Sequence, residues 1–408
     1  MEILYLFSLF LLLPKIDLFE FGGSSVRPED IVWLIAIFSF VLFRIKNISF
    51  KLPDYFHIFI VYILLCVFSL VINSRDSGWG GVYFILRQIQ YATWGMMAIV
   101  VSNKIPRDEF RKHLEVLAII FVIWGGLEWL GLVGKVGKFS TVRDRISINT
   151  SGPFETSVVL AVLAFSVRGT FLKISLGLML WFTQARITII ASIMAILYRS
   201  SRSLLGIGIA TLILLASIFL AGGQISSSRF SDSLSPLRMV HIMNVMWQSA
   251  PVVRSRGEFL DAAGYTSKYI DRYNGQLAVV RGDLSFQIRA YRWALIGKFL
   301  LNNPLQMIIG CSPGYFGVAV DSNLIRLIAE SGILGSITYL FFIFSFWNFP
   351  RDTLTRQISI VMLITAIFID IFWSSKVMTM LWFISSWEYN QKESLLNSQR
   401  TTFSVFKK

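Results

Sequence analysis

The sequence predicts an all-α polytopic integral membrane protein with about twelve transmembrane helices and one large outer loop that carries interfacial helices. The chain is 55% hydrophobic and 15% charged, so one soluble core cannot bury its apolar surface. Apolar stretches long enough to cross a bilayer recur along the chain. A polar, basic stretch at residues 222–320 interrupts them late in the sequence.

The apolar stretches give the expected positions of the helices. A span needs roughly 20 apolar residues and must be helical, because lipid cannot form hydrogen bonds with the backbone. The first stretch lacks a basic start and a small-residue cleavage site before Pro14, so we interpret it as a retained span rather than a signal peptide. We expect spans near residues 2–14, 30–44, 54–72, 83–101, 114–133, 156–168, 171–184, 187–199, 204–221, 322–347, 357–373 and 376–388.

Basic residues in the short loops predict the orientation, because Lys and Arg resist translocation. They follow every second span, which places these loops and both termini in the cytoplasm. The chain then divides into spans one to nine at 1–221, an outer loop at 222–320, spans ten to twelve at 321–388 and a cytoplasmic tail at 389–408. The loop residues are Arg44, Lys46, Lys51, Lys104, Arg107, Arg111, Lys112, Arg168, Lys173, Arg199, Arg202, Arg351 and Arg356.

The outer loop is expected to fold, since a structureless connection of this length is unusual. Leu237–Trp247 and Phe286–Leu301 mix apolar and basic residues in a pattern typical of helices on a membrane surface. The loop holds ten basic and five acidic residues, and ten minus five gives a net charge of +5. Long loops escape the positive-inside rule, which is one explanation. The other is an anionic ligand, because arginine binds phosphate through paired hydrogen bonds.

Charged residues within the spans are further candidates, because a charge in hydrocarbon is costly and usually faces a partner or a cavity. Arg186 lies in a tight outer turn, Phe182-Thr-Gln-Ala-Arg186, and Arg87 lies near the outer end of its span. Each of these two arginines either reaches lipid phosphates or serves the function. Glu128 and Asp370 are interpreted as polar links between helices. The acids and histidines do not have metal-ligand spacing, so the sequence predicts neither a metal nor a cofactor.

Several motifs together resemble the O-antigen polymerase and O-antigen ligase superfamily. The resemblance covers the whole chain by topology, although each motif alone is loose. Two earlier stretches, Ser151-Gly-Pro-Phe154 and Thr183-Gln-Ala-Arg186, look like a helix entry and a turn of that family. The carboxy-terminal motifs are Arg289-x-x-x-Trp293, Asn303-Pro304, Gly310, Gly314 and Glu330-x-Gly332-x-x-Gly335.

The resemblance favours a Wzy-type O-antigen polymerase. Family ligases typically carry a histidine where this chain has Asp321. The implied enzyme is a metal-independent glycosyltransferase that joins undecaprenyl-pyrophosphate-linked oligosaccharide repeat units into O-antigen or a related surface polysaccharide. It would work at the periplasmic face of a bacterial inner (cytoplasmic) membrane, which makes the outer loop periplasmic. The implied partners are the lipid-linked oligosaccharide, the lipid bilayer and a chain-length regulator protein, and not nucleic acid.

Site roles follow from this implied reaction. Arg289 and Arg186, with Arg292 and Arg87 as further substrate-binding residues, are expected to bind the pyrophosphate leaving group as its charge develops. Asp321 is the candidate base, or orienting group, for the acceptor hydroxyl. Glu330 is a weaker catalytic candidate, because it lies about two and a half helical turns deeper, and it has an alternative as a hydrogen-bond partner between helices. Gly332 and Gly335 are attributed to close helix packing.

Three other functions stay open. A ligase of the same superfamily transfers glycan to lipid A core. A flippase or other transporter of lipid-linked oligosaccharide has a similar number of spans, although such proteins usually show an internal repeat and charge spread through a central cavity. A membrane assembly factor without enzymatic activity is the third. Recognition of the sugar, the linkage and the chain length has no readable code in the sequence.

Overall fold

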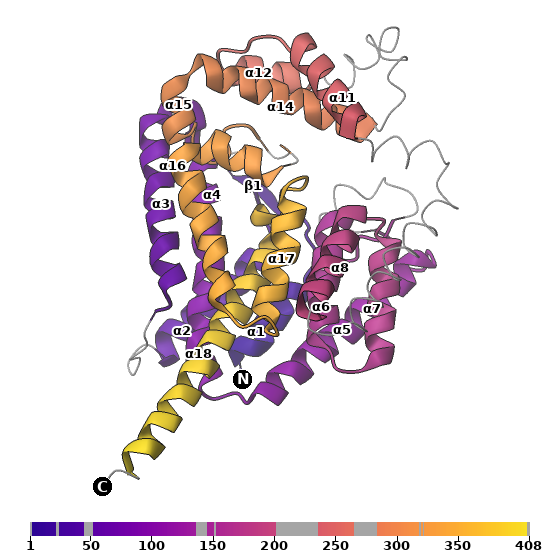
Figure 1. The fold of residues 1–408 in the computed structure, drawn as a ribbon, viewed down its shortest axis with the longest axis vertical. Helices are drawn as coiled ribbons and strands as arrows, with labels where there is room; N and C mark the ends of the chain where they lie inside the picture. Colours follow the sequence, from indigo (N-terminus) through magenta and orange to yellow (C-terminus); the bar gives the residue numbers. More distant parts are fainter. Residues whose placement is uncertain are drawn as a thin grey trace.

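The computed structural model describes residues 2–21, 24–44, 52–135, 145–150, 152–200, 236–264, 284–317, 320 and 322–405, and these residues are mainly helical. Most helices stand side by side in a bundle (Figure 1). They are α1 (Glu2–Leu12), α2 (Pro28–Arg44), α3 (Asp54–Ile72), α4 (Ser74–Ser102), α5 (Arg107–Trp129), α6 (Pro153–Ser166), α7 (Thr170–Phe182), α8 (Arg186–Ser200), α16 (Asn323–Ser345), α17 (Leu354–Ala366) and α18 (Ser375–Val405).

Three further helices lie across one end of the bundle, namely α11 (Pro236–Ser249), α12 (Arg256–Gly264) and α14 (Leu284–Asn302). We call them the transverse layer. They have a hydrophobic core of their own, in which Phe259, Leu295 and Phe299 are buried. Helix α15 (Pro304–Ile309) joins this layer to α16, and the marked N and C ends of the chain lie at the opposite end of the bundle (Figure 1). The sequence predicts helices at the positions of α11 and α14.

The centre of the bundle is formed by α4 and α18, which pack along each other. Helix α16 packs on α3, and α17 packs on α6 and α8. The main hydrophobic core joins these helices through large buried side chains such as Trp94 and Trp382. Ring contacts supplement this burial, since Trp382 stacks on Phe342 with ring centroids 5.0 Å apart.

The predicted spans within the described residues coincide with helices, whereas the predicted span 204–221 lies outside them. By length and apolar composition, two of the described helices are candidates to cross a membrane, Asp54–Ile72 and Asn323–Asn348. Four other apolar helices are shorter, namely Glu2–Leu12, Pro153–Ser166, Thr170–Phe182 and Leu354–Ala366. The structure thus shows a helical bundle, and the number of spans stays a prediction.

Two local features differ from the predicted pattern. Strands β1 (Phe19–Phe21) and β2 (Ser24–Val26) pair antiparallel, where the sequence analysis predicts only helices and loops. The signal was available, because two glycines between short runs with aromatic and β-branched residues favour a hairpin. The helix observed in place of the expected span 357–373 is also shorter than predicted. Helix α17 ends at Ala366, and a short 3-10 helix, η3, covers Ile371–Trp373.

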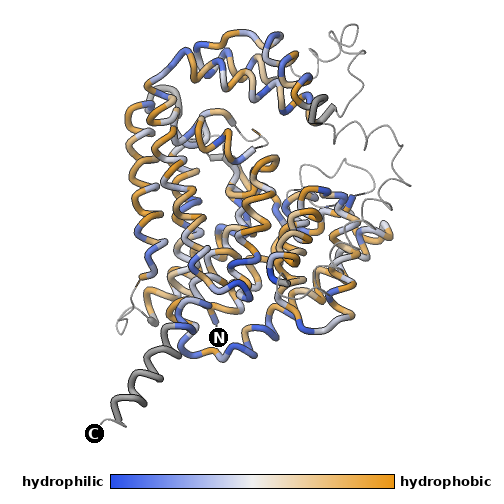
Figure 2. Tube along the Cα trace, viewed as in Figure 1, coloured by the Kyte–Doolittle hydropathy of each residue, from blue (hydrophilic) through white to orange (hydrophobic). Residues whose placement is uncertain are grey.

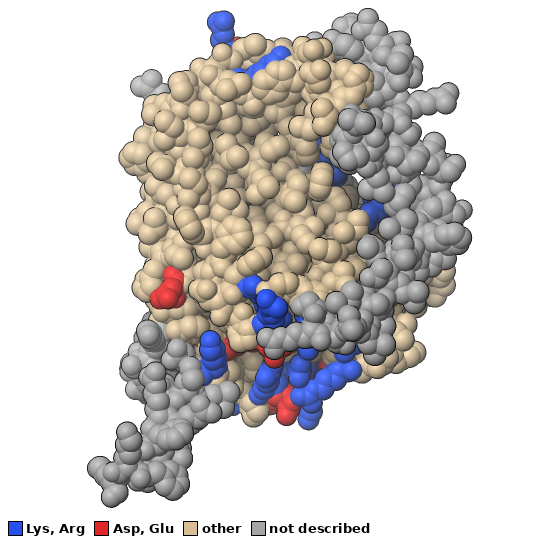
Figure 3. Space-filling model, viewed as in Figure 1, with Lys and Arg blue, Asp and Glu red and all other residues tan. Residues whose placement is uncertain are grey.

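The exterior of the bundle carries many large apolar side chains. Leu64 and Val71 on α3 are 62% and 66% exposed, and Phe341 on α16 is 62% exposed. The hydropathy trace shows hydrophobic residues along these helices (Figure 2). On the face drawn in Figure 3, Lys and Arg gather at the end of the bundle opposite the transverse layer. An apolar surface of this extent marks contact with another apolar phase or partner.

Candidate functional site

Arg326 is the centre of a buried charge cluster near the transverse layer. The residue is 1% exposed. The guanidinium donates to Asp370 Oδ2 through Nη1 at 3.0 Å and to Glu330 Oε1 through Nε at 3.2 Å. A third hydrogen bond, 2.5 Å long, runs from Nη2 to the carbonyl of Gly317. Because a buried charge needs partners on every side, this arginine fixes the position of all three groups.

The cluster extends upward to the transverse layer through Val320. The backbone amide of Val320 donates to Asp370 Oδ2 at 3.2 Å. Its carbonyl accepts a 3.0 Å hydrogen bond from the indole Nε1 of Trp293 on α14. Asp370 therefore links the helices as its sequence context suggests. Sequence analysis missed Arg326 itself, although its place four residues before Glu330 is the spacing of an ion pair on one helix face.

The backbone at Gly310 passes in close contact with the backbone at Gly332. This contact fixes the turn between the transverse layer and α16. Gly332 interrupts α16 with a φ of 70°, and Gly310 ends α15 with a φ of 87°. The freed carbonyl of Ala329 accepts from the amide of Cys311 at 2.9 Å. A Cβ on Gly332 would lie 2.2 Å from the carbonyl oxygen of Ile308. Close packing, the predicted role of Gly332, is therefore only part of its role, because it also breaks the helix.

A second buried cluster lies where α1 ends and α6 and α18 begin. Lys15 forms an ion pair with Glu155 at 2.6 Å, and Ser374 donates to the same carboxylate at 2.5 Å. Lys376 donates to the carbonyls of Leu11, Leu13 and Asn149 at 2.9, 2.6 and 2.9 Å. Burial lowers the pKa of the Lys15 ammonium from its ordinary value, and the carboxylates of Glu155 and Glu29 oppose that shift.

Arg87 belongs to the edge of this second cluster. It lies 3.2 Å from Asp30 and 3.9 Å from Glu29, and its Nη2 donates to the hydroxyl of Tyr83 at 2.6 Å. Ser375 donates to Glu29 at 2.6 Å, which joins this edge to the start of α18. Arg87, expected to bind substrate, is 8% exposed and forms contacts within the protein.

The segment between α17 and α18, residues 367–374, connects the two clusters. Asp370 belongs to the first and Ser374 to the second. The intervening backbone is also bound: the amide of Phe372 donates to Asn323 at 2.9 Å, and its carbonyl accepts from Gln88 at 3.3 Å. An unwound segment inside a helical bundle needs such partners, because its backbone groups lose the bonds of a helix. We call residues 367–374 the α17–α18 linker.

The arginines expected to bind pyrophosphate lie at the transverse-layer end of α6. The Arg289 guanidinium is 5.8 Å from the ring centre of Phe154, in the first turn of α6. Arg186 is the first residue of α8. Two residues later, Thr188 accepts a 2.8 Å hydrogen bond from Ser157 of α6, so α8 begins beside the first turns of α6. Motifs far apart in the sequence therefore meet at one end of one helix.

The tight turn before Arg186 agrees with the sequence analysis. Helix α7 ends at Phe182, and the chain reverses through Thr183–Ala185, with Gln184 at a φ of 53°. The Thr183 hydroxyl donates to Leu180 and accepts from the amide of Ala185. Arg292, three residues after Arg289, follows it by nearly one turn of α14, and both side chains are half-buried.

The remaining predicted site residues are Asp321 and Glu330. Asp321 lies outside the described residues. The N-cap of α16 is its neighbour Ser322, whose hydroxyl accepts from the amide of Ile325 at 3.5 Å. Glu330 is 1% exposed and pairs with Arg326 of its own helix. Its charged partner therefore lies on its own helix.

Glu128 also has a structural partner. It accepts hydrogen bonds from the backbone amides of Ser147 and Ile148 at 2.8 and 2.6 Å, and so holds the segment before α6.

Within the residues described by the structure, His, Cys, Asp and Glu side chains form no group of three or more that could hold a metal ion. No protein-family model, curated protein or solved structure matches the chain.

Proposed function

We propose that the protein is a membrane-embedded polymerase that joins oligosaccharide repeat units carried on undecaprenyl pyrophosphate. One observation carries the proposal: Arg289 of the transverse layer lies over Phe154 while Arg186 begins α8 beside the same end of α6. Two arginines from distant parts of the chain thus border one end of the bundle. Paired arginines are suited to a diphosphate, because each guanidinium offers several donors in a fixed plane.

Insertion into a lipid bilayer is the first part of the proposal. It is supported by the two helices of sufficient length and by the exposed apolar side chains of α3 and α16. The marked ends of the chain both lie toward the end of the bundle opposite the transverse layer (Figure 1). This arrangement fits the predicted orientation, in which both termini are cytoplasmic and the transverse layer lies at the periplasmic face of the bacterial inner membrane. The number of spans, about twelve, belongs to the proposal as well.

The chemistry requires an attacking hydroxyl and a stabilised leaving group. The hydroxyl of one repeat unit attacks the anomeric carbon of the other glycan, and the bond from that carbon to the lipid pyrophosphate breaks. Negative charge accumulates on the departing pyrophosphate, where Arg289 and Arg186 would bind it, with Arg292 as a further donor. The first turn of α8 adds the positive end of a helix dipole beside Arg186. The proton of the hydroxyl passes to the proposed base, the carboxylate of Asp321.

The buried clusters have a different part in this proposal. Arg326, Glu330 and Asp370 hold the turn before α16 against the α17–α18 linker, and they thereby position the chain that leads to Asp321. Arg87 supports the region around Asp30 from within the bundle. We assign neither Glu330 nor Arg87 a chemical step, since both are buried and already form ion pairs within the protein.

A transporter of the same lipid-linked oligosaccharide is the second candidate. It is favoured by the cluster around Lys15 and Lys376, because helix ends and charges that meet inside a bundle are typical of transport sites. Lys376, however, is fully buried and donates to three backbone carbonyls, which suits a structural role. The polymerase explains the paired arginines at the bundle end, and we therefore favour it.

The decisive experiment compares glycans in a strain that lacks the gene. Loss of a polymerase leaves one repeat unit on each lipid core, whereas loss of a ligase or a flippase leaves none. Complementation with Arg289→Ala or Arg186→Ala should restore no polymer, and Arg289→Lys should restore little because it lacks the planar fork. Arg254→Ala is the matched control, since Arg254 is exposed in the same layer. Full-length polymer from both alanine variants at normal protein levels would refute the proposed binding of pyrophosphate by Arg289 and Arg186.

A further inference from the structure

A second collection of arginines lies at the opposite end of the bundle. A cleft there is bordered by α5, α8, α18 and the ends of α6 and α17, and part of it is open to solvent. Arg107 and Arg111 come from the first turns of α5, and Arg199 comes from the last turn of α8. The first turns of α5 and the last turn of α8 lie at the end of the bundle opposite the transverse layer (Figure 1), so the cleft takes no part in the proposed polymerase chemistry.

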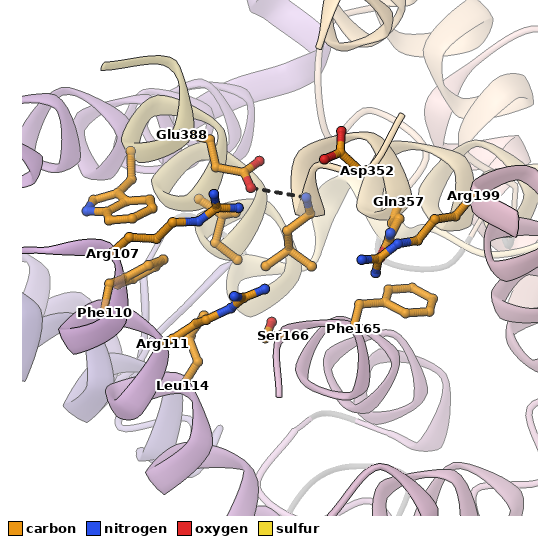
Figure 4. A pocket seen from close by; sticks show the side chains of 13 residues that line it. Arg107, Phe110, Arg111, Leu114, Phe165, Ser166, Arg199, Asp352, Gln357 and Glu388 are labelled. Carbon is orange, nitrogen blue, oxygen red and sulfur yellow. Dashed lines mark hydrogen bonds between the residues drawn. The ribbon is translucent and has the colours of Figure 1, made fainter. Parts of the chain in front are cut away.

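The three guanidinium groups share one space. Figure 4 shows Arg111 and Arg199 extending toward the middle of the cleft from opposite walls, with Arg107 beside Glu388. Arg111 is close enough to Arg107 and Arg199 to be repelled by both. Within the described ranges, none of these three arginines forms an ion pair with a carboxylate. Clustered like charges that outnumber the acids around them favour an external anion.

The two acids of the cleft offset only part of this positive charge. Glu388 accepts from the amides of Leu354 and Thr355 at 3.1 and 2.9 Å and from the Thr355 hydroxyl at 2.7 Å, so it caps the start of α17 (Figure 4). Asp352 is exposed at the rim. Three arginines and two acids give a net charge of +1, and one of those acids is committed to backbone amides.

The rest of the lining is apolar and aromatic. Phe110, Leu114, Phe165, Ile384 and Trp387 also line the cleft. A basic rim above an apolar wall matches an amphipathic anion better than a free one, because the acyl region gains contact area while the phosphate meets the arginines. The cleft also lies where Lys and Arg gather at the end of the bundle, which is the level of lipid headgroups in the proposed orientation (Figure 3).

We infer that this cleft binds the phosphate headgroup of an anionic glycerophospholipid from the cytoplasmic leaflet, with Arg107, Arg111 and Arg199 as ligands. The inference goes beyond the proposed chemistry and rests on the proposed membrane insertion and orientation of the chain. A polymerase assay that fails leaves it intact, since lipid binding is measured without the reaction. Bound lipid would hold α5 to α8 at a point where no internal ion pair joins them within the described residues.

Native mass spectrometry of the full chain in detergent, titrated with phosphatidylglycerol, provides the test. Each arginine near an anionic headgroup contributes about fivefold in affinity, so Arg111→Ala with Arg199→Ala should weaken binding about 25-fold. Lys112→Ala is the control, because it removes one positive charge from an exposed neighbour outside the cleft, and it should lose far less than fivefold in affinity. A second double variant, Arg111→Lys with Arg199→Lys, changes the same two side chains but keeps both positive charges. It therefore separates a loss of charge from a failure to fold.

Two comparisons identify the source of the phosphate. Phosphatidylcholine should bind at least about tenfold more weakly than phosphatidylglycerol, because its headgroup carries no net charge. Inorganic phosphate at millimolar concentration should not displace phosphatidylglycerol. Displacement by inorganic phosphate would assign the cleft to a soluble anion and overturn the inference that its ligand is a lipid. Equal losses in the double variant and in Lys112→Ala, or no loss in the double variant, would overturn the site itself.

Discussion

Arg326 and Asp370 lie 3.0 Å apart and join the first turns of α16 to the unwound linker between α17 and α18. The arginine is 2% exposed at its side chain and the aspartate 15%. Around this pair, the rings of Phe84 and Trp373 lie 5.5 and 5.1 Å from the guanidinium carbon. The contact holds together two segments that are far apart in sequence, and both lead to the end of the bundle where the transverse layer lies.

Removal of Arg326 should therefore destabilise the protein strongly. Arg326→Ala leaves the carboxylates of Glu330 and Asp370 buried without their counter-ion, which costs about 3 to 5 kcal/mol. The measurement is the thermal unfolding of the detergent-solubilised protein, followed by gel filtration. Arg168→Ala is the control, because the Arg168–Asp108 pair is 60% and 69% exposed and such pairs contribute about 0 to 1 kcal/mol. Equal shifts in both variants would contradict the role assigned to Arg326.

Gly332 should tolerate no side chain. Its φ of 70° disfavours any L residue, and a Cβ would approach the carbonyl oxygen of Ile308 to 2.2 Å, where the backbone cannot yield cheaply. Gly332→Ala should reduce the yield of folded protein severely. Gly177→Ala in α7 is the matched control, since a Cβ there meets nothing within 4 Å. Normal yield and stability of Gly332→Ala would show that α16 is unbroken at this position.

Lys376 should be essential to stability rather than to the reaction. Lys376→Met keeps much of the side-chain length but leaves the carbonyls of Leu11, Leu13 and Asn149 without their donor, at about 1 to 3 kcal/mol for each unsatisfied group. Lys173→Met, at an exposed position of α7, should change little. A Lys376→Met protein that is as stable as the parent but inactive in the cell would favour a transport role for the central cluster.

Substitutions at Asp321 and Ser322 should distinguish a role in the reaction from a role in capping α16. Ser322 supplies the N-cap of α16, so Ser322→Ala should cost about 1 kcal/mol of stability and leave polymer formation intact. Asp321→Asn and Asp321→Ala should both be inserted normally and yet accumulate single repeat units on the lipid carrier, because each lacks the proposed base. Polymer of normal length from Asp321→Asn would exclude the carboxylate and leave the arginines as the proposed machinery.

The elements that followed from the sequence are those that depend on local patterns. Apolar runs of sufficient length predicted α3 and α16, and mixed apolar and basic spacing predicted α11 and α14. The turn before Arg186 was also predictable, because only a few polar residues separate two apolar runs and a longer connection does not fit between them. Local periodicity and turn chemistry act over a few residues, and one sequence displays them directly.

Partners distant in the chain were not predictable in this way. Lys15 meets Glu155, Lys376 meets the end of α1, and Arg289 reaches Phe154 only because the helices pack in one particular order. Spacing along a single helix gives no information on which charge lies opposite, since that depends on the packing of whole helices. Local patterns therefore predicted the helical class, the candidate arginines and their turn. Helix packing brought the arginines to one end of α6 and enclosed the other charges, because a buried charge is stable only where distant segments supply its partners.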